Sequence, residues 1–223
     1  MDQFRDTFPQ ADENPLSSGG NWSNGYSNNL QVVGGIVRQT LGGDNNEESV
    51  NSISPGANAF AKFRIAAIGA GPGYAHACVR MTAPTTLTYY SAFAAVNDGA
   101  KKTAIYKSVA GVTTHIQTEN ASADWAVNDT LELRAIGPLL VAYKNGEALL
   151  SATDSDITLA GRVGINIAGA TIGNIEVDDF SGGDYFASRS ILEPKHLIAM
   201  LEDDGGFDDL DVRNWWKSRV EFA

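Results

Sequence analysis

The strongest constraint on the fold is the alternation of apolar and polar residues between positions 130 and 167. Leu131, Leu133 and Ala135 alternate with charged residues, which is typical of a strand with one buried and one solvated face. A later run turns at Asn145-Gly146, a pair preferred in type I′ hairpin turns. The pattern therefore predicts antiparallel β-structure made of short strands.

Similar runs occur along most of the first 180 residues, each bounded by Gly, Pro, Asn or Asp. Gly34-Gly35 separates two β-branched runs and supplies the positive φ that a tight hairpin needs. Many short strands at this spacing predict a sandwich or jelly roll rather than a parallel α/β sheet. We expect a polar loop at 40–56 and strands at 30–33, 36–39, 60–65, 74–81, 86–96, 104–109, 113–118, 131–135, 139–143, 148–152, 161–167 and 172–180.

The pattern changes after Phe180, and we predict a β-sandwich at 1–181, a linker at 182–185 and an α-helical tail at 186–223. Pro194 suits the first turn of one helix, and acidic residues followed by basic ones suit a second. Each helix carries its apolar residues on one face. A short tail cannot bury two adjacent tryptophans by itself, so we expect this face to dock on the sandwich or on a partner. The predicted contact residues are Leu197, Leu201, Val212, Trp215, Trp216 and Val220.

A chain of 223 residues can bury enough surface to fold without disulfides. The single Cys78 lies in an alternating run and is predicted to be a buried, unreactive thiol. The net charge of −11 comes with no basic stretch, so we expect no binding to nucleic acid. We also expect neither a secretory signal nor a membrane span, because the start lacks a basic and an apolar region and no run reaches about 18 apolar residues.

One pair of carboxylates could suggest catalysis. Glu176 and Asp178 alternate along a predicted strand, which places their side chains on one face about 7 Å apart. Retaining glycosidases use two carboxyl groups about 5–5.5 Å apart. A strand end that faces water explains the pair better, and we predict no catalytic residues and no enzyme.

The sequence predicts no dedicated metal site. His76, His115 and His196 lie in separate elements without the paired spacing of metal ligands. Two groups could supply oxygens to calcium in a lectin-like loop, although neither matches an EF-hand. These groups are Asp124, Asn128 and Asp129, and Asp154 with Asp156. Calcium is therefore kept as an alternative to no cofactor.

Aromatic residues offer a further possibility, because sugars stack on aromatic rings. The candidates for glycan binding are Tyr89, Tyr90, Trp125 and Tyr143. A large indole more often fills the core of a sandwich, and we expect this of Trp22 and Trp125.

Several segments together resemble the concanavalin A-like (laminin G-like) jelly-roll modules found in bacteriophage virion proteins and bacterial surface proteins. The likeness covers roughly residues 4–181, although Pro9-Gln10 stands where an Asn-Arg pair is common. It implies that Asp6–Phe8 and Asp178–Phe180 lie together as first and last strands. It rests on Asp6-Thr7-Phe8, Asn21-Trp22, Leu30–Val33, Leu131–Arg134, Tyr143–Gly146, Gly161–Gly164 and Val177–Phe180.

Glucanases of this group carry a Glu-x-Asp-x-(x)-Glu strand, whereas Phe180 and Ser181 stand here in place of the third carboxylate. The resemblance therefore implies the fold and not hydrolysis. Our first functional hypothesis is a virion structural protein, either a capsid decoration (cement) protein or a tail or fibre component. It would form a homo-oligomer and contact other virion proteins. The alternative is a carbohydrate-binding module for host surface glycans, and a glucanase-type glycosidase comes third.

Overall fold

The computed structural model describes residues 3–24, 30–43, 47–50, 53, 55–82, 88–99, 102–119 and 124–185. The unit Met1–Tyr185 is a β-sandwich, and the predicted tail with its six contact residues lies outside the described residues. A 3-10 helix, η1, spans Ser18–Gly20. The strands are β1 (Gln3–Asp6), β2 (Trp22–Asn24), β3 (Leu30–Val33), β4 (Ile36–Gln39), β5 (Glu47–Val50), β6 (Ala59–Ile68), β7 (Gly73–Met81), β8 (Tyr89–Val96), β9 (Thr103–Val109), β10 (Val112–Glu119), β11 (Thr130–Ile136), β12 (Leu139–Lys144), β13 (Glu147–Thr153), β14 (Arg162–Gly169) and β15 (Ile175–Asp184).

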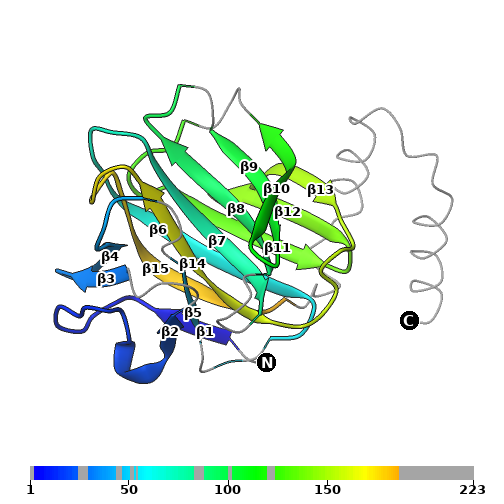
Figure 1. Ribbon diagram of the computed structural model, residues 1–223, viewed down its shortest axis with the longest axis horizontal. Helices are drawn as coiled ribbons and strands as arrows, with labels where there is room; N and C mark the ends of the chain where they lie inside the picture. The colour runs from blue at the N-terminus through cyan, green and yellow to red at the C-terminus, as the bar shows by residue number, and fades with distance from the viewer. Residues whose placement is uncertain are drawn as a thin grey trace, which may run out of the picture. The chain divides into compact units, whose positions relative to one another are not determined.

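The strands form two antiparallel sheets. The eight-stranded sheet has the order β13-β12-β11-β6-β15-β4-β3, with β1 paired to β15. The seven-stranded sheet has the order β10-β9-β8-β7-β14-β5-β2. Strands β1 to β5 lie on one side of the sandwich, away from β9, β10 and β13 (Figure 1). The prediction of an all-β sandwich is confirmed.

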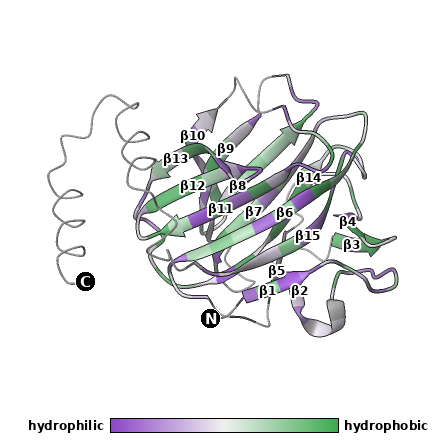
Figure 2. Ribbon diagram, turned by 180° about the vertical axis from the view of Figure 1, so that it is seen from behind, coloured by the Kyte–Doolittle hydropathy of each residue, from purple (hydrophilic) through white to green (hydrophobic). Residues whose placement is uncertain are grey.

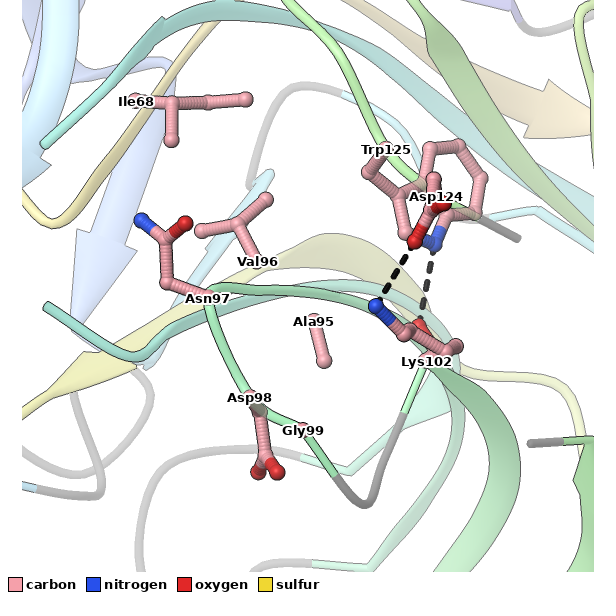
Figure 3. A pocket seen from close by; sticks show the side chains of 9 residues that line it. All are labelled: Ile68, Ala95, Val96, Asn97, Asp98, Gly99, Lys102, Asp124 and Trp125. Atoms are coloured by element: carbon pink, nitrogen blue, oxygen red, sulfur yellow. Dashed lines mark hydrogen bonds and ion pairs between the residues drawn. The ribbon is translucent and has the colours of Figure 1, made fainter. Parts of the chain in front are cut away.

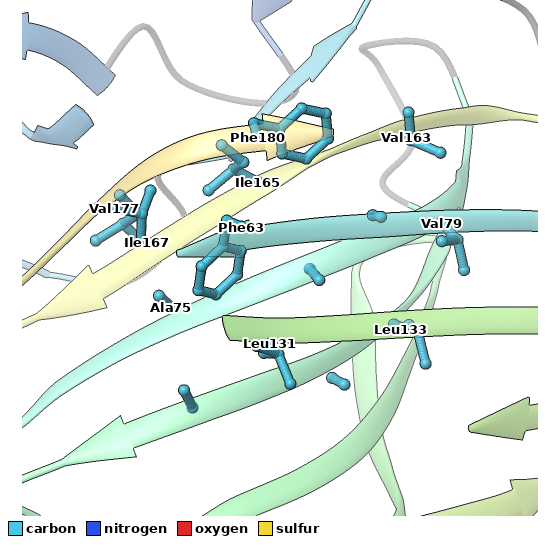
Figure 4. Packing of buried hydrophobic residues seen from close by; sticks show 14 of the residues in the cluster. Phe63, Ala75, Val79, Leu131, Leu133, Val163, Ile165, Ile167, Val177 and Phe180 are labelled. Carbon is cyan, nitrogen blue, oxygen red and sulfur yellow. The ribbon is translucent and has the colours of Figure 1, made fainter. Parts of the chain in front are cut away.

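The two sheets contribute differently to the core between them. The eight-stranded sheet supplies large side chains such as Phe63, Leu131 and Leu133, all fully buried (Figure 4). Strand β7 of the seven-stranded sheet meets them with smaller residues such as Ala75 and Val79. Along β6 and β11, hydrophobic and hydrophilic residues follow one another as the alternation predicts (Figure 2).

The first and last strands close the sandwich together, as the resemblance implied. Asp6 of β1 pairs with Phe180 of β15 in antiparallel register. Trp22 packs edge-on against Phe180, with ring centroids 5.0 Å apart. Its Nε1 donates to Asp6 Oδ2 at 2.9 Å, which satisfies a buried indole N–H. The expectation that Trp22 fills the core is confirmed.

Two sequence predictions are corrected here. The predicted linker at 182–185 is wrong as far as Asp184, because β15 continues to that residue and Gly182 pairs with Ala61. A Cβ at position 182 would lie 2.8 Å from Val163 Cγ2, so this glycine permits close packing rather than flexibility. The predicted loop at 40–56 contains β5, which pairs with β14 and β2.

Within the part of the chain that the structure describes, no helix has the length and apolar character needed to cross a bilayer.

Candidate functional site

The four aromatic residues predicted to bind glycan do not lie together. Tyr90 is 0% exposed, and its hydroxyl donates to Asp154 Oδ1 at 2.6 Å. Burial, together with the Asp154 carboxylate, raises the pKa of Tyr90 to about 12. Because the ring lies inside the core, it has no face to offer a sugar.

The other three candidates are dispersed over the molecule. Trp125 is 8% exposed, and its Nε1 donates to Lys102 O at 3.0 Å, so it packs in the core as expected. Tyr143 is half-buried on the outer face of the eight-stranded sheet, where the Arg134 guanidinium lies 3.9 Å from its ring centroid. Tyr89 is 6% exposed, in a small cluster with Cys78 and Met81.

The structure instead brings five other rings together on the outer face of the seven-stranded sheet. In β7 and β8, Ala75, Ala77, Ala92 and Ala94 point into the core. The residues between them therefore point outward, because side chains alternate along a strand. We call the resulting cluster the aromatic face and define it as Tyr74, His76, Phe93, Tyr106 and His115.

Phe93 lies at the centre of the aromatic face. It is only 2% exposed, and its ring centroid lies 5.3 Å from both His76 and Tyr106. Tyr74 packs edge-on against it at 5.8 Å. His115 packs edge-on against Tyr106, with centroids 3.9 Å apart. The outer rings are half-buried, or exposed in the case of His115, so the cluster presents aromatic surface to solvent.

Two groups of the aromatic face, His76 and Tyr106, are uncharged at neutral pH. Burial lowers the pKa of His76 to about 4, so the imidazole is uncharged. Its Nδ1 lies 3.4 Å from Ser91 Oγ. Burial raises the pKa of Tyr106, which keeps the phenol protonated. Neutral rings with polar edges can combine stacking with hydrogen bonding.

A pocket of about 380 Å³ adjoins this face beyond the end of β8. Its lining includes Asn97, Asp98, Lys102 and Trp125, and Lys102 Nζ reaches Asp124 Oδ1 at 2.7 Å (Figure 3). The Tyr74 hydroxyl donates to Asp98, which joins the pocket to the aromatic face.

The carboxylates weighed as catalytic lie on the other side of the molecule. Glu176 and Asp178 flank the buried Val177 on β15 and therefore face outward from the eight-stranded sheet. Glu176 Oε1 lies 3.6 Å from Arg38, and Asp178 Oδ2 lies 2.6 Å from Arg64. Burial, with the neighbouring Asp179 and Asp6, raises the pKa of Asp178.

The four carboxylates among the candidate calcium ligands form ion pairs with lysines, and Asn128 Oδ1 accepts from Arg64 Nη1 at 3.1 Å. Asp154 and Asp156 each lie 2.5 Å from Lys107 Nζ, and Asp129 lies 3.0 Å from Lys144 Nζ. Among the residues described, no group of three His, Cys, Asp or Glu side chains is arranged to hold a metal ion.

Sequence reasoning missed the aromatic face, although a signal was present. In Tyr74-Ala75-His76-Ala77 and Ser91-Ala92-Phe93-Ala94, alanine alternates with larger or polar residues. Small residues on one face of a central strand leave its bulk on the other. Treating His76 and His115 as unrelated overlooked that Tyr106 has a ring contact with each of them.

Comparison with solved structures identifies the fold. The carbohydrate binding module CBM66 from Bacillus subtilis superposes with a TM-score of 0.57 at 16% identity, over 76% of this chain and 96% of that module. A lichenase (β-1,3-1,4-glucanase) from a mouse hindgut metagenome superposes with a TM-score of 0.54 at 13% identity, over 83% of this chain and 100% of the lichenase chain. The Ca²⁺/mannose-bound exoplasmic/lumenal domain of VIP36 superposes with a TM-score of 0.53 at 12% identity, over 79% of this chain and 90% of that domain.

These similarities define the class: the protein has the concanavalin A-like β-sandwich fold shared by lectins and glucanases. Identities of 12 to 16% carry the fold alone. No family model and no curated protein matches the chain.

Proposed function

We propose that the protein is a carbohydrate-binding module that holds its ligand on the aromatic face. The observation that carries this proposal is the gathering of five rings from four neighbouring strands on one outer sheet face. Aromatic residues have an apolar body and, in Tyr and His, a polar edge. The apolar faces of a sugar can stack on such rings while its hydroxyls bond to their edges.

The polar edges of the outer rings suit this ligand, since a few polar groups among apolar ones are the usual composition of a small-molecule site. Ser91 and Asn166 lie beneath the rings, 1% and 5% exposed, and support the cluster from within the sheet. The likeness to CBM66, whose name describes carbohydrate binding, and to mannose-bound VIP36 supports the proposal at the level of the fold.

We propose binding without hydrolysis. Glu176 and Asp178 face outward from the eight-stranded sheet, and a sugar on the aromatic face would be out of their reach. If any glycan hydrolysis is detected, Glu176→Gln should leave its rate unchanged. A loss of activity in that variant would contradict this part of the proposal.

A glycan array followed by titration calorimetry tests the binding proposal with the full chain. Tyr106→Ala removes the ring between Phe93 and His115, and should weaken binding of any glycan found by roughly 10-fold or more, since a good aromatic contact contributes about 1.5 kcal/mol. The matched control is Tyr143→Ala, a half-buried tyrosine on the other sheet.

Silence across the array would overturn the proposal. A loss in Tyr143→Ala with none in Tyr106→Ala would move the site to the eight-stranded sheet. The hypothesis of a virion structural protein stays a prediction, because its contact residues lie outside the described residues. Deleting residues 186–223 and measuring incorporation into particles would test it.

A further inference from the structure

The arginines of the sandwich point to a more specific ligand. Five of the six arginines at positions 1–185 either form an ion pair with a carboxylate or donate to several backbone carbonyls. Arg80 donates to three backbone carbonyls, those of Ala57, Gly137 and Ile157. Four others form ion pairs with carboxylates: Arg5 with Asp179, Arg38 with Glu176, Arg64 with Asp178 and Arg134 with Glu132. Arg162 is the exception, because no carboxylate of the described residues lies within ion-pair distance of it.

Arg162 is held in place without being neutralised. Its Nη1 donates to Ser23 Oγ at 3.0 Å and to Ser49 Oγ at 3.4 Å, and these two oxygens are themselves 3.3 Å apart. Hydroxyl groups orient a guanidinium but leave its charge in full. The side chain is half-buried, so the charge is partly withdrawn from water. Such a group gains most from an anion that can accept two parallel N–H bonds.

Arg162 faces the same side of the sheet as the aromatic face. Its neighbour Val163 belongs to the core, and so does Val50 beside Ser49. Arg162 and Ser49 therefore point outward. A single register row crosses the sheet from Tyr106 through Ser91, Cys78 and Gly164 to Ser49. Four interstrand spacings separate its ends, about 19 Å.

The charge pattern selects the ligand. Among the outward-facing strand residues of the seven-stranded sheet whose side chains the structure describes, Arg162 is the one arginine, lysine, aspartate or glutamate. A neutral glycan would leave this half-buried charge without a counterion. A carboxylate matches the planar fork of a guanidinium. The chain as a whole has an excess of negative charge, −11. An arginine without a carboxylate partner on the proposed binding surface is therefore an exception to the composition of the chain.

We propose that the glycan bound on the aromatic face is an acidic oligosaccharide whose uronic acid carboxylate pairs with Arg162 while its other sugars lie on the rings around Tyr106. This inference rests on the proposed function and names its substrate class. It makes Arg162 a specificity-determining residue, because loss of this residue should affect acidic ligands alone.

The test is titration calorimetry of the full chain with oligomers of galacturonate, glucuronate, mannuronate and guluronate, each beside its methyl ester. For the uronate that binds, the acid should bind more tightly than its methyl ester, and raising the salt concentration should reduce this difference in affinity. Arg162→Gln should weaken binding of the acid roughly 10- to 100-fold, as expected for loss of a charge-assisted pair, and leave the ester unchanged. Arg162→Lys should lie between, since it keeps the charge and loses the fork.

The control is Arg38→Gln, which removes an arginine from the opposite sheet and should leave both affinities unchanged. Circular dichroism checks that each variant is folded, and Arg162→Lys serves if Arg162→Gln is not. Equal binding of acid and ester, unaffected by Arg162→Gln, would overturn this inference and leave the proposed function standing. No binding of any glycan would overturn both.

Discussion

The outer faces of the two sheets differ in how they meet solvent. On the eight-stranded sheet, charged residues pair with one another, as in Arg64 with Asp178 and Arg134 with Glu132. On the seven-stranded sheet, rings are clustered and one arginine, Arg162, has no carboxylate partner among the described residues. A sheet face whose charged groups are paired within the chain gains little from binding a ligand. We therefore expect a ligand on the seven-stranded sheet, where Arg162 lacks such a partner.

The same difference extends to the core. The eight-stranded sheet turns its bulk inward, with Phe63 at 0% exposure, and the seven-stranded sheet turns part of its bulk outward, with Phe93 under other rings. Phe63→Ala should therefore cost about 4 kcal/mol of stability, the range for emptying a close-packed core site. Phe93→Ala should cost about 2 kcal/mol, because neighbouring rings and water can fill its place.

Urea denaturation of both variants measures these losses. Equal losses would show that the aromatic face is packed as tightly as the core and would weaken the case for a binding surface. Phe93→Leu, which keeps an apolar side chain of similar size, should recover most of the stability.

The aromatic face should also respond to acid. Burial lowers the pKa of His76 from its ordinary 6.5 to about 4, so between these values the unfolded chain binds a proton that the folded chain does not. The contribution of neutral His76 to the free energy of unfolding is therefore fully present above pH 6.5 and is lost as the pH falls toward 4. The part due to His76 is up to about 3 kcal/mol.

Thermal denaturation across this pH range checks the expectation. His76→Gln should make the melting temperature depend less on pH. His115→Gln, a change to an exposed imidazole, should leave the pH dependence of the wild type unchanged. An unchanged pH dependence in His76→Gln would mean that other groups cause the acid sensitivity.

Much of the fold could be predicted because its signals are local. The Gly34-Gly35 turn and the flanking alternation define β3 and β4, and Asn145-Gly146 defines the turn between β12 and β13. Strand β5 could not be predicted, because its polar residues become a strand only through pairing with β14. The glycines at 182–183 resembled a linker, although Gly182 serves close packing against Val163.

The candidate site was less predictable, since it depends on which side of a strand becomes the inside. The adjacent Tyr89 and Tyr90 must face opposite ways, and alternation alone does not say which faces the core. The structure buries Tyr90 against Arg80, whose guanidinium lies 5.7 Å from its ring centroid. Tyr106 and His115 are in contact only because β9 and β10 are paired.

The smallest expected effects separate the two kinds of arginine. Arg64 Nη2 and Nε lie 2.6 and 2.8 Å from Asp178 and Asp179, so Arg64→Met should cost about 1 kcal/mol, the upper range for a partly exposed ion pair. Arg162→Met removes two hydrogen bonds to serines and no ion pair, and should cost less than about 0.5 kcal/mol. Urea denaturation at low and high salt measures both: the loss in Arg64→Met should shrink with salt, and that in Arg162→Met should not. A large, salt-sensitive loss in Arg162→Met would reveal a carboxylate partner within the chain, and the contrast between the two faces would then disappear.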